Sequence, residues 1–181
     1  NEGATGSFTS CTFLDNSASG AGGVFYVKNT GAGLSVTASV LSGNDASKGG
    51  MVYALDADSI QWDSNVACDN SASTSGGGIH FENTDSTIER SVFQLNYSLD
   101  GAGVYVVSGN HVLLNNTFVE NQDALDGSAV YLQGGAGATD IRNNIVAHAT
   151  DGVGVYVDAS AANFSIEYND FWQNLDGPLG G

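Results

Sequence analysis

The stretch DGAGVYVVSGN, from Asp100 to Asn110, recurs along the chain with small changes. Two closely similar segments, DGSAVYLQGG and DGVGVYVDAS, begin at Asp126 and Asp151. Repetition at a nearly constant interval is typical of repeat architectures, in which one short unit is used many times. Other positions of the chain recur at the same interval.

Each unit contains an apolar residue, called the anchor here, at the first position of a four-residue segment. These segments are FLDN, LSGN, ACDN, FQLN, FVEN, VAHA and FWQN. These anchors are Phe13, Leu41, Ala67, Phe93, Phe118, Val146 and Phe171, which are spaced 25 to 28 residues apart. Five residues before each anchor lies a second column without a polar member. It consists of Phe8, Val36, Trp62, Ile88, Leu113, Ile141 and Ile166. This second column is predicted to point into a core.

Small polar residues flank every anchor. The column three residues after the anchor consists of Asn16, Asn44, Asn70, Asn96, Asn121, Ala149 and Asn174. The column two residues before it consists of Cys11, Ser39, Asn65, Ser91, Asn116, Asn144 and Asn169. Stacked amides can hydrogen-bond one another. The six asparagines of the first column are therefore predicted to form a structural ladder.

After each asparagine of the first column come two adjacent small residues and then a predicted strand. Examples are GGVFYV from Gly22, GGMVYA from Gly49 and GGIHFE from Gly77. If the second small residue is taken as the origin, the positions one and three further on are apolar in every copy. Alternation along a strand then predicts that the position between them faces outward. That position holds Phe25, Val52, His80, Tyr105, Tyr131 and Tyr156.

Units of this kind cannot bury their own apolar positions, but stacked units can. The sequence therefore predicts an all-β fold: a single-stranded parallel β-helix, or solenoid, of about seven turns of 25–28 residues with three short strands per turn. Equivalent residues of neighbouring turns would lie about 4.8 Å apart. Residues 1–181 are predicted to be a single domain of this architecture.

The motifs FxxN and GGA followed by Ile, Leu or Val resemble the repeats of right-handed parallel β-helix proteins. They are especially similar to repeats of the polymorphic outer-membrane-protein type of autotransporter passenger. Here the motifs appear as FLDN, FQLN, FVEN and FWQN, and as GGVF, GGMV and GGGI. The resemblance implies a right-handed coil. It does not choose a function, because pectate lyases, polygalacturonases, phage tailspikes and surface adhesins share the fold.

The two ends of the sequence carry no recognisable cap. Gly180 and Gly181 occupy the small pair that would open another strand, and the chain begins with the tail of a turn. Open ends of a β-helix expose unpaired strand edges. We expect the chain to be part of a longer array, with end-to-end assembly of subunits as the alternative.

Composition limits the classes of partner. Four basic against 20 acidic residues give a net charge of −16, which repels nucleic acid and anionic lipid. No apolar run approaches the length of about 20 residues that a membrane helix needs, so direct membrane insertion is not expected. The two cysteines, Cys11 and Cys68, lie in different columns about two turns apart and are predicted to be free, largely buried thiols.

An Asp-Gly column recurs at Asp100, Asp126 and Asp151. Stacked carboxylates repel one another, and a bound cation would reverse that repulsion; calcium prefers such oxygen ligands. The alternative is ordinary turn chemistry, with side chains that splay into water. The fold requires no cofactor, and calcium at these three residues is the one candidate.

The predicted outward column, namely Phe25, His80, Tyr105, Tyr131 and Tyr156, also has two interpretations. A stripe of aromatic rings suits contact with sugar rings or with a partner protein. Cross-strand stacking that only stabilises the sheet is the alternative.

No convergent catalytic set is apparent. A group such as Asp63, Glu89 and Arg90 is more simply a solvated ion-pair cluster. The histidines His80, His111 and His148 fall in different columns, for which surface or turn positions are expected.

The leading hypothesis is therefore a non-enzymatic module at the cell surface or outside the cell. It would be a stiff spacer or adhesin that binds glycans, surface proteins or further copies of itself. The alternative is a fragment of a polysaccharide lyase or glycoside hydrolase.

Overall fold

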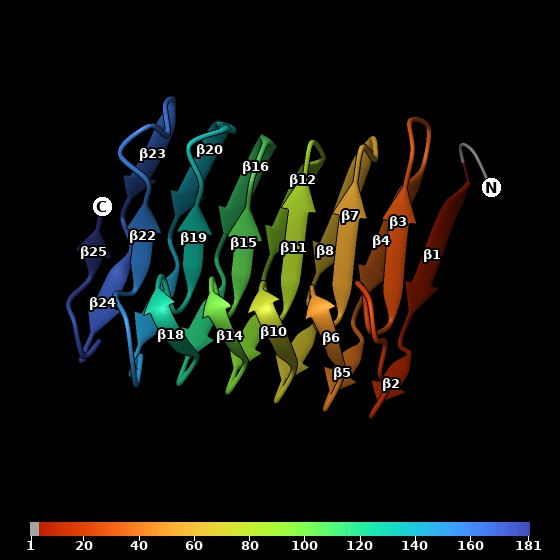
Figure 1. Ribbon diagram of the computed structural model, residues 1–181, viewed down its shortest axis with the longest axis horizontal. Helices are drawn as coiled ribbons and strands as arrows, with labels where there is room; N and C mark the ends of the chain where they lie inside the picture. Colours follow the sequence, from red (N-terminus) through yellow and green to blue (C-terminus); the bar gives the residue numbers. More distant parts are fainter. Residues whose placement is uncertain (1–3) are drawn as a thin grey trace.

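The computed structural model describes residues 4–181, and that part of the chain contains strands and no helix. The chain winds into coils that follow one another along a single axis (Figure 1). All strand pairs between neighbouring turns are parallel, as in the pairing of Val92–Gln94 with Thr117–Val119. The prediction of an all-β parallel solenoid of about seven turns is confirmed. None of the described residues belongs to a helix that could cross a membrane.

Equivalent strands of successive turns form four sheets, named A to D here. Sheet A contains β1 (Thr5–Thr9), β4 (Gly33–Thr37), β8 (Ser59–Asp63), β12 (Asp85–Glu89), β16 (Gly109–Leu114), β20 (Ala136–Arg142) and β23 (Phe164–Glu167). Sheet B contains β2 (Thr12–Leu14), β5 (Val40–Ser42), β9 (Val66–Cys68), β13 (Val92–Gln94), β17 (Thr117–Val119), β21 (Ile145–Ala147) and β24 (Asp170–Trp172). Sheet C contains β6 (Asp45–Lys48), β10 (Ser71–Ser75), β14 (Tyr97–Asp100) and β18 (Gln122–Asp126). Sheet D contains β3 (Phe25–Lys28), β7 (Val52–Leu55), β11 (Ile79–Glu82), β15 (Val104–Val106), β19 (Val130–Leu132), β22 (Val155–Val157) and β25 (Leu179–Gly180).

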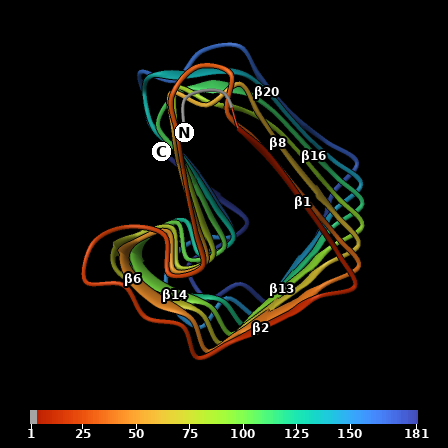
Figure 2. The same cartoon turned by 90° about the vertical axis from the view of Figure 1, so that its right-hand side faces the viewer.

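Sheet C gives the central turns a fourth short strand beyond the three expected. It lies on a lobe that projects from the rest of the coil, where β6 and β14 are labelled in Figure 2. Its strands are built from the residues between the asparagine column and the following glycine. Only Thr150 and Asp151 separate Ala149 from Gly152, so the sixth turn is too short to add a strand there.

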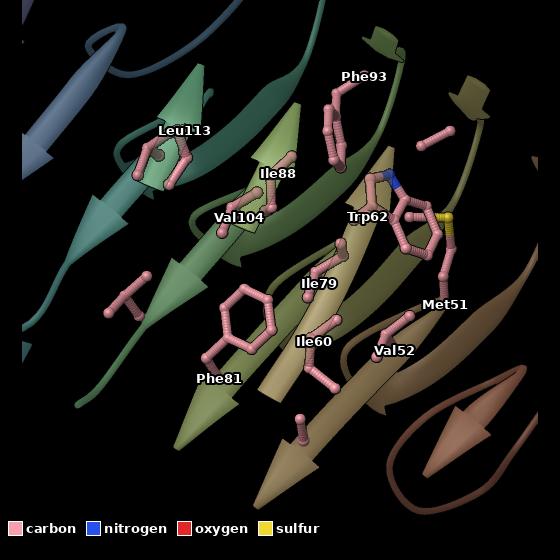
Figure 3. Close-up of a cluster of buried hydrophobic side chains, with 14 of the residues drawn as sticks. Met51, Val52, Ile60, Trp62, Ile79, Phe81, Ile88, Phe93, Val104 and Leu113 are labelled. Carbon is pink, nitrogen blue, oxygen red and sulfur yellow. The ribbon is translucent and has the colours of Figure 1, made fainter. Parts of the chain in front are cut away.

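The interior is a continuous apolar column. Phe93 and Phe118 are register partners, and their ring centroids lie 5.0 Å apart with a 16° angle between the planes. Trp62 is buried beside Phe93, with the two centroids 6.5 Å apart. Figure 3 shows side chains from sheets A, B and D gathered in this interior. Stacked anchors therefore bury what no single turn could bury.

Amide side chains connect the turns at the two corners of sheet B. The Nδ2 groups of Asn16, Asn44, Asn70 and Asn96 each donate to Oδ1 of the next asparagine in the ladder, at 2.9–3.0 Å. Their backbone N–H groups donate to the same Oδ1 atoms at 3.0–3.1 Å. The column that begins at Cys11 forms a second ladder of serine and asparagine acceptors. These bonds satisfy buried backbone groups at turns that sheet pairing alone leaves open.

The first ladder is interrupted at Ala149. The amide of Asn121 consequently donates only to the Phe93 carbonyl, whereas the amide of Asn96 has two acceptors. An asparagine at position 149 would accept from Asn121. We expect Ala149→Asn to raise the free energy of unfolding by about 1 kcal/mol, measured by denaturant unfolding. Ala149→Leu, which has a similar shape without an acceptor, should give no gain; an equal gain would assign the effect to packing.

Candidate functional site

The aromatic column on the outer face of sheet D differs from the predicted one at its first two members. The register partners in this column are Tyr26, Tyr53, His80, Tyr105, Tyr131 and Tyr156. The prediction that placed Phe25 and Val52 there is wrong, and so is the inward position predicted for Tyr26 and Tyr53. Phe25 packs toward the core, where its ring lies 4.9 Å from that of Phe8, and Val52 is fully buried.

The register was predicted wrongly because positions were counted from the second small residue of each pair instead of from the first glycine. Every copy contains a glycine with positive φ three residues before the first inward strand residue, namely Gly22, Gly49, Gly76, Gly101, Gly127 and Gly152. At Gly49 an added Cβ would collide with the Val52 carbonyl oxygen, so both the conformation and the space require glycine there. Counting from this first glycine aligns Phe25, Val52 and Ile79. That constant spacing was present in the sequence and would have given the correct register.

The rings of this column stack on one another along the axis. Centroid distances are 4.8 Å for His80 with Tyr105, 4.9 Å for Tyr105 with Tyr131, and 4.8 Å for Tyr131 with Tyr156. Each ring therefore covers the face of its neighbour, and the interior members of the column offer mainly ring edges to a ligand. Burial raises the pKa of both Tyr105 and Tyr131 to about 12. This geometry favours the interpretation that the column stabilises sheet D.

A cleft of about 300 Å³ lies where the ends of the sheet C strands approach the outer face of sheet D. Lys48, Ser75 and Asp100, from β6, β10 and β14, line one side. His80 and Glu82, from β11, line the other. The cleft thus combines one cation, carboxylates, hydroxyls and an imidazole from sequentially separate turns.

Three of these side chains form a hydrogen-bonded chain. Ser75 Oγ lies 2.8 Å from His80 Nδ1, and His80 Nε2 lies 3.0 Å from Glu82 Oε1. Lys48 Nζ donates to the same Glu82 oxygen at 2.9 Å. Burial raises the pKa of Glu82, but hydrogen bonds from Lys48 and Tyr53 outweigh it and hold the pKa below its usual value. Glu82 is therefore ionised and selects the tautomer in which Nε2 carries the proton and Nδ1 accepts from the Ser75 hydroxyl.

A second serine–histidine pair lies inside the coil. Ser86 Oγ is 2.8 Å from His111 Nδ1, and within the described residues His111 Nε2 has no hydrogen-bond partner. Burial lowers the pKa of both His80 and His111 to about 4, against the opposing attraction of nearby carboxylates. The expectation of surface or turn positions is wrong for these two residues, each 1% exposed. His80 lies on the outer face of sheet D, where the rings of Tyr53 and Tyr105 cover it. His111 lies two residues before Leu113 and shares its inward face of β16.

The Asp-Gly column is only partly stacked. Asp100 and Asp126 are register partners, and burial, followed by the charge of Asp126, raises the pKa of Asp100. Asp151 does not stack on Asp126, because the short sixth turn brings it opposite Gln122 instead. Among the residues that the structure describes, no group of three or more acidic, histidine or cysteine side chains converges as a metal site. Asp100, Asp126 and Asp151 are therefore not assembled as the three-aspartate site, and calcium binding stays a prediction.

Asp123 is a buried carboxylate in the adjoining corner of the coil. Its Oδ1 accepts from the Leu125 N–H at 2.7 Å, whereas its Oδ2 has no partner among the described residues. Burial raises its pKa to about 7, against three backbone hydrogen bonds and with a smaller contribution from Asp100. The folded state therefore binds the proton more tightly than the unfolded chain does.

This shift predicts a specific pH dependence. The protonated form of Asp123 stabilises the fold below pH 4, and that contribution is lost as the pH rises through about 7. Asp123→Asn removes this titration. We therefore expect the free energy of unfolding of the variant, minus that of the wild type, to be about 1–3 kcal/mol larger at pH 8 than at pH 4. Urea unfolding of both proteins at the two pH values measures this. The same difference between the two proteins at both pH values would contradict this prediction.

The remaining sites of the sequence prediction are solvent-accessible. Arg90 Nη2 lies 2.7 Å from Asp63 Oδ2, and Arg90 Nη1 lies 2.8 Å from Glu89 Oε2. The hydrogen bond from Arg90 lowers the pKa of Asp63 despite some desolvation. The group is an exposed ion-pair cluster, as expected. Cys11 and Cys68 are free, but both are partly exposed rather than largely buried.

A family model described as the right-handed beta helix region matches residues 22–179. A second model, the Chlamydia polymorphic membrane protein repeat, matches residues 10–28. Neither the curated proteins nor the solved structures yield a match.

Proposed function

The chain belongs to the right-handed β-helix family, and on that premise we propose that it is a structural module displayed outside the cell or at its surface. The module acts as a stiff spacer that carries an adhesive face. The match of its first repeat to the polymorphic membrane protein repeat supports a surface location. Its net charge of −16 is compatible with a soluble, extended surface layer.

The observation that carries the mechanical role is the continuity of the axial bonding. Neighbouring turns share parallel strands in sheets A, B and D, and asparagine ladders join the corners between them. Bending such a rod would separate strand pairs and ladder bonds on one side at the same time. A solenoid of this type is therefore stiff over its whole described length.

The adhesive role is assigned to the outer face of sheet A. A groove of about 590 Å³ runs across it, lined by outward residues such as Gln61, Thr87, Asn110, Asp140 and Ser165. The apolar side chains of Val112, Ala138 and Phe164 line it as well. A groove that combines apolar surface with amide, hydroxyl and carboxylate groups suits the carbon face and the hydroxyls of a glycan, or a mixed patch on a surface protein. The aromatic column is not assigned this role, because its rings cover one another.

Two measurements test the proposal. Antibodies raised against the chain should label intact cells of the organism that makes it, without permeabilisation. Labelling only after permeabilisation would overturn the surface location.

For the adhesive face, Thr87→Lys places a bulky charge in the groove, and it should reduce binding to a glycan array at least tenfold. Lys28→Ala, on sheet D, is the matched control and should bind like the wild type.

A fragment of a polysaccharide lyase or glycoside hydrolase is the second candidate, because such enzymes share the right-handed β-helix fold. Its test is degradation of acidic polysaccharides, since a lyase leaves unsaturated ends that absorb ultraviolet light.

A further inference from the structure

We propose that Ser75, His80 and Glu82 form a nucleophilic relay that hydrolyses small neutral esters through an acyl group carried on Ser75 Oγ. This inference goes beyond the spacer role and does not depend on it. It revises the sequence-based expectation that the module carries no chemistry.

The connectivity of the relay is that of an activated nucleophile. A base must lie within hydrogen-bond reach of the nucleophile, and a third group must orient the base. Here the distances are 2.8 Å from Ser75 Oγ to His80 Nδ1 and 3.0 Å from His80 Nε2 to Glu82 Oε1. The Ser75 proton points toward Nδ1, which leaves the oxygen lone pairs for attack.

The imidazole is held in one orientation. It lies between the rings of Tyr53 and Tyr105, with centroids 5.1 Å and 4.8 Å away, and is 1% exposed. Lys48 fixes the acid at the far end by its bond to Glu82. A base that needs no rearrangement before it accepts a proton is an advantage in catalysis.

Stacking alone does not account for a histidine at this position. Every other member of the column is a tyrosine, which stacks equally well. In the preceding turn the residues in register with Ser75, His80 and Glu82 are Lys48, Tyr53 and Leu55. All three polar side chains of the relay thus occur together in one turn, although the repeat does not require any of them.

The cleft limits the substrate. Its volume of about 300 Å³ is at the lower end for ligand sites, so it suits an acetyl or other short acyl group. Asp100 lies on the same wall as Ser75, and the only cation of the cleft, Lys48, is paired with Glu82. Anionic esters are therefore disfavoured, and neutral esters such as O-acetylated alcohols or sugars fit.

The reaction is balanced without an added cofactor. Ser75 Oγ bonds to the ester carbonyl carbon while its proton moves to His80 Nδ1. The bond between that carbon and the alkoxy oxygen breaks, and the alcohol leaves with the proton from Nδ1. Water then gives a proton to Nδ1, its oxygen bonds to the acyl carbon, and the Oγ–carbon bond breaks. Oγ recovers its proton, and the products are a carboxylic acid and an alcohol.

The test uses the whole chain with p-nitrophenyl acetate and with a fluorophosphonate probe, which loses fluoride as it bonds to an activated serine. We expect the probe on Ser75, located by mass spectrometry of the wild-type protein. Ser75→Ala should lower ester hydrolysis and labelling at least tenfold. His80→Tyr, which restores the residue type of the column and should fold, should do the same.

Ser86→Ala is the matched control, because Ser86 bonds to His111 without an acid partner. It should react like the wild type. An unlabelled Ser75 in the wild-type protein, or wild-type hydrolysis by Ser75→Ala, would overturn the proposal.

The pH profile identifies the base. His80 must be neutral to accept the proton. Burial lowers its pKa to about 4; the charge of Glu82 opposes this shift and that of Lys48 adds to it. Tyr53, Asp100 and Tyr105 are the other titratable groups around the ring. Labelling should therefore be constant from pH 6 to 8 and fall by half near pH 4. A midpoint near 6.5, the value of an exposed histidine, would contradict His80 as the base.

Discussion

Asn96→Ala is expected to lower the free energy of unfolding by about 3–5 kcal/mol. The Asn96 side chain accepts from the backbone and the amide of Asn70, and it donates to the Ala67 carbonyl and to Asn121 Oδ1. Asn70, Asn96 and Ala67 are all fully buried. Removing the amide leaves several buried polar groups without partners, and each costs about 1–3 kcal/mol when water cannot replace the bond.

Chemical denaturation followed by circular dichroism measures this loss. Asn16→Ala is the matched control, because Asn16 is exposed at the end of the ladder and donates to Asn44 without an asparagine above it. Its loss should be about 1 kcal/mol or less. Equal losses at the two positions would mean that burial of the ladder does not determine its contribution.

Phe93→Ala is expected to cost about 3–5 kcal/mol. The ring is fully buried, stacks on Phe118 and lies beside Trp62. Its register partner in the preceding turn is Ala67, which is already small. The substitution would therefore leave a void that spans two turns. The strands cannot close it, because hydrogen bonds between turns fix their spacing.

Trp62 provides a fluorescence signal close to the void, so urea unfolding followed by tryptophan emission measures the effect. Phe171→Ala is the control, because Phe171 occupies the same column in the last sheet B strand and is only partly buried. We expect it to cost about 1–2 kcal/mol. If Phe93→Ala cost less than Phe171→Ala, the anchors would not form the continuous core described above.

Most of the fold could be predicted because the period of the sequence sets the stacking. A spacing of 25 to 28 residues places Phe93 on Phe118 and Asn70 on Asn96, whatever path the chain takes between them. The same argument failed at Phe25 and Val52, where the choice between two adjacent glycines shifted the strand by one residue. In a strand, such a shift turns every side chain to the opposite face.

Which residues of different turns lie over one another can be read from the repeat interval, since axial stacking follows from periodicity. Which residues of one turn meet across a corner depends instead on the three-dimensional path of the chain. Ser75 and His80 are five residues apart, and their contact depends on the turn at Gly76 and on the angle between sheets C and D. That angle is set by the backbone path and by packing around the whole turn, to which no repeat interval in the sequence corresponds.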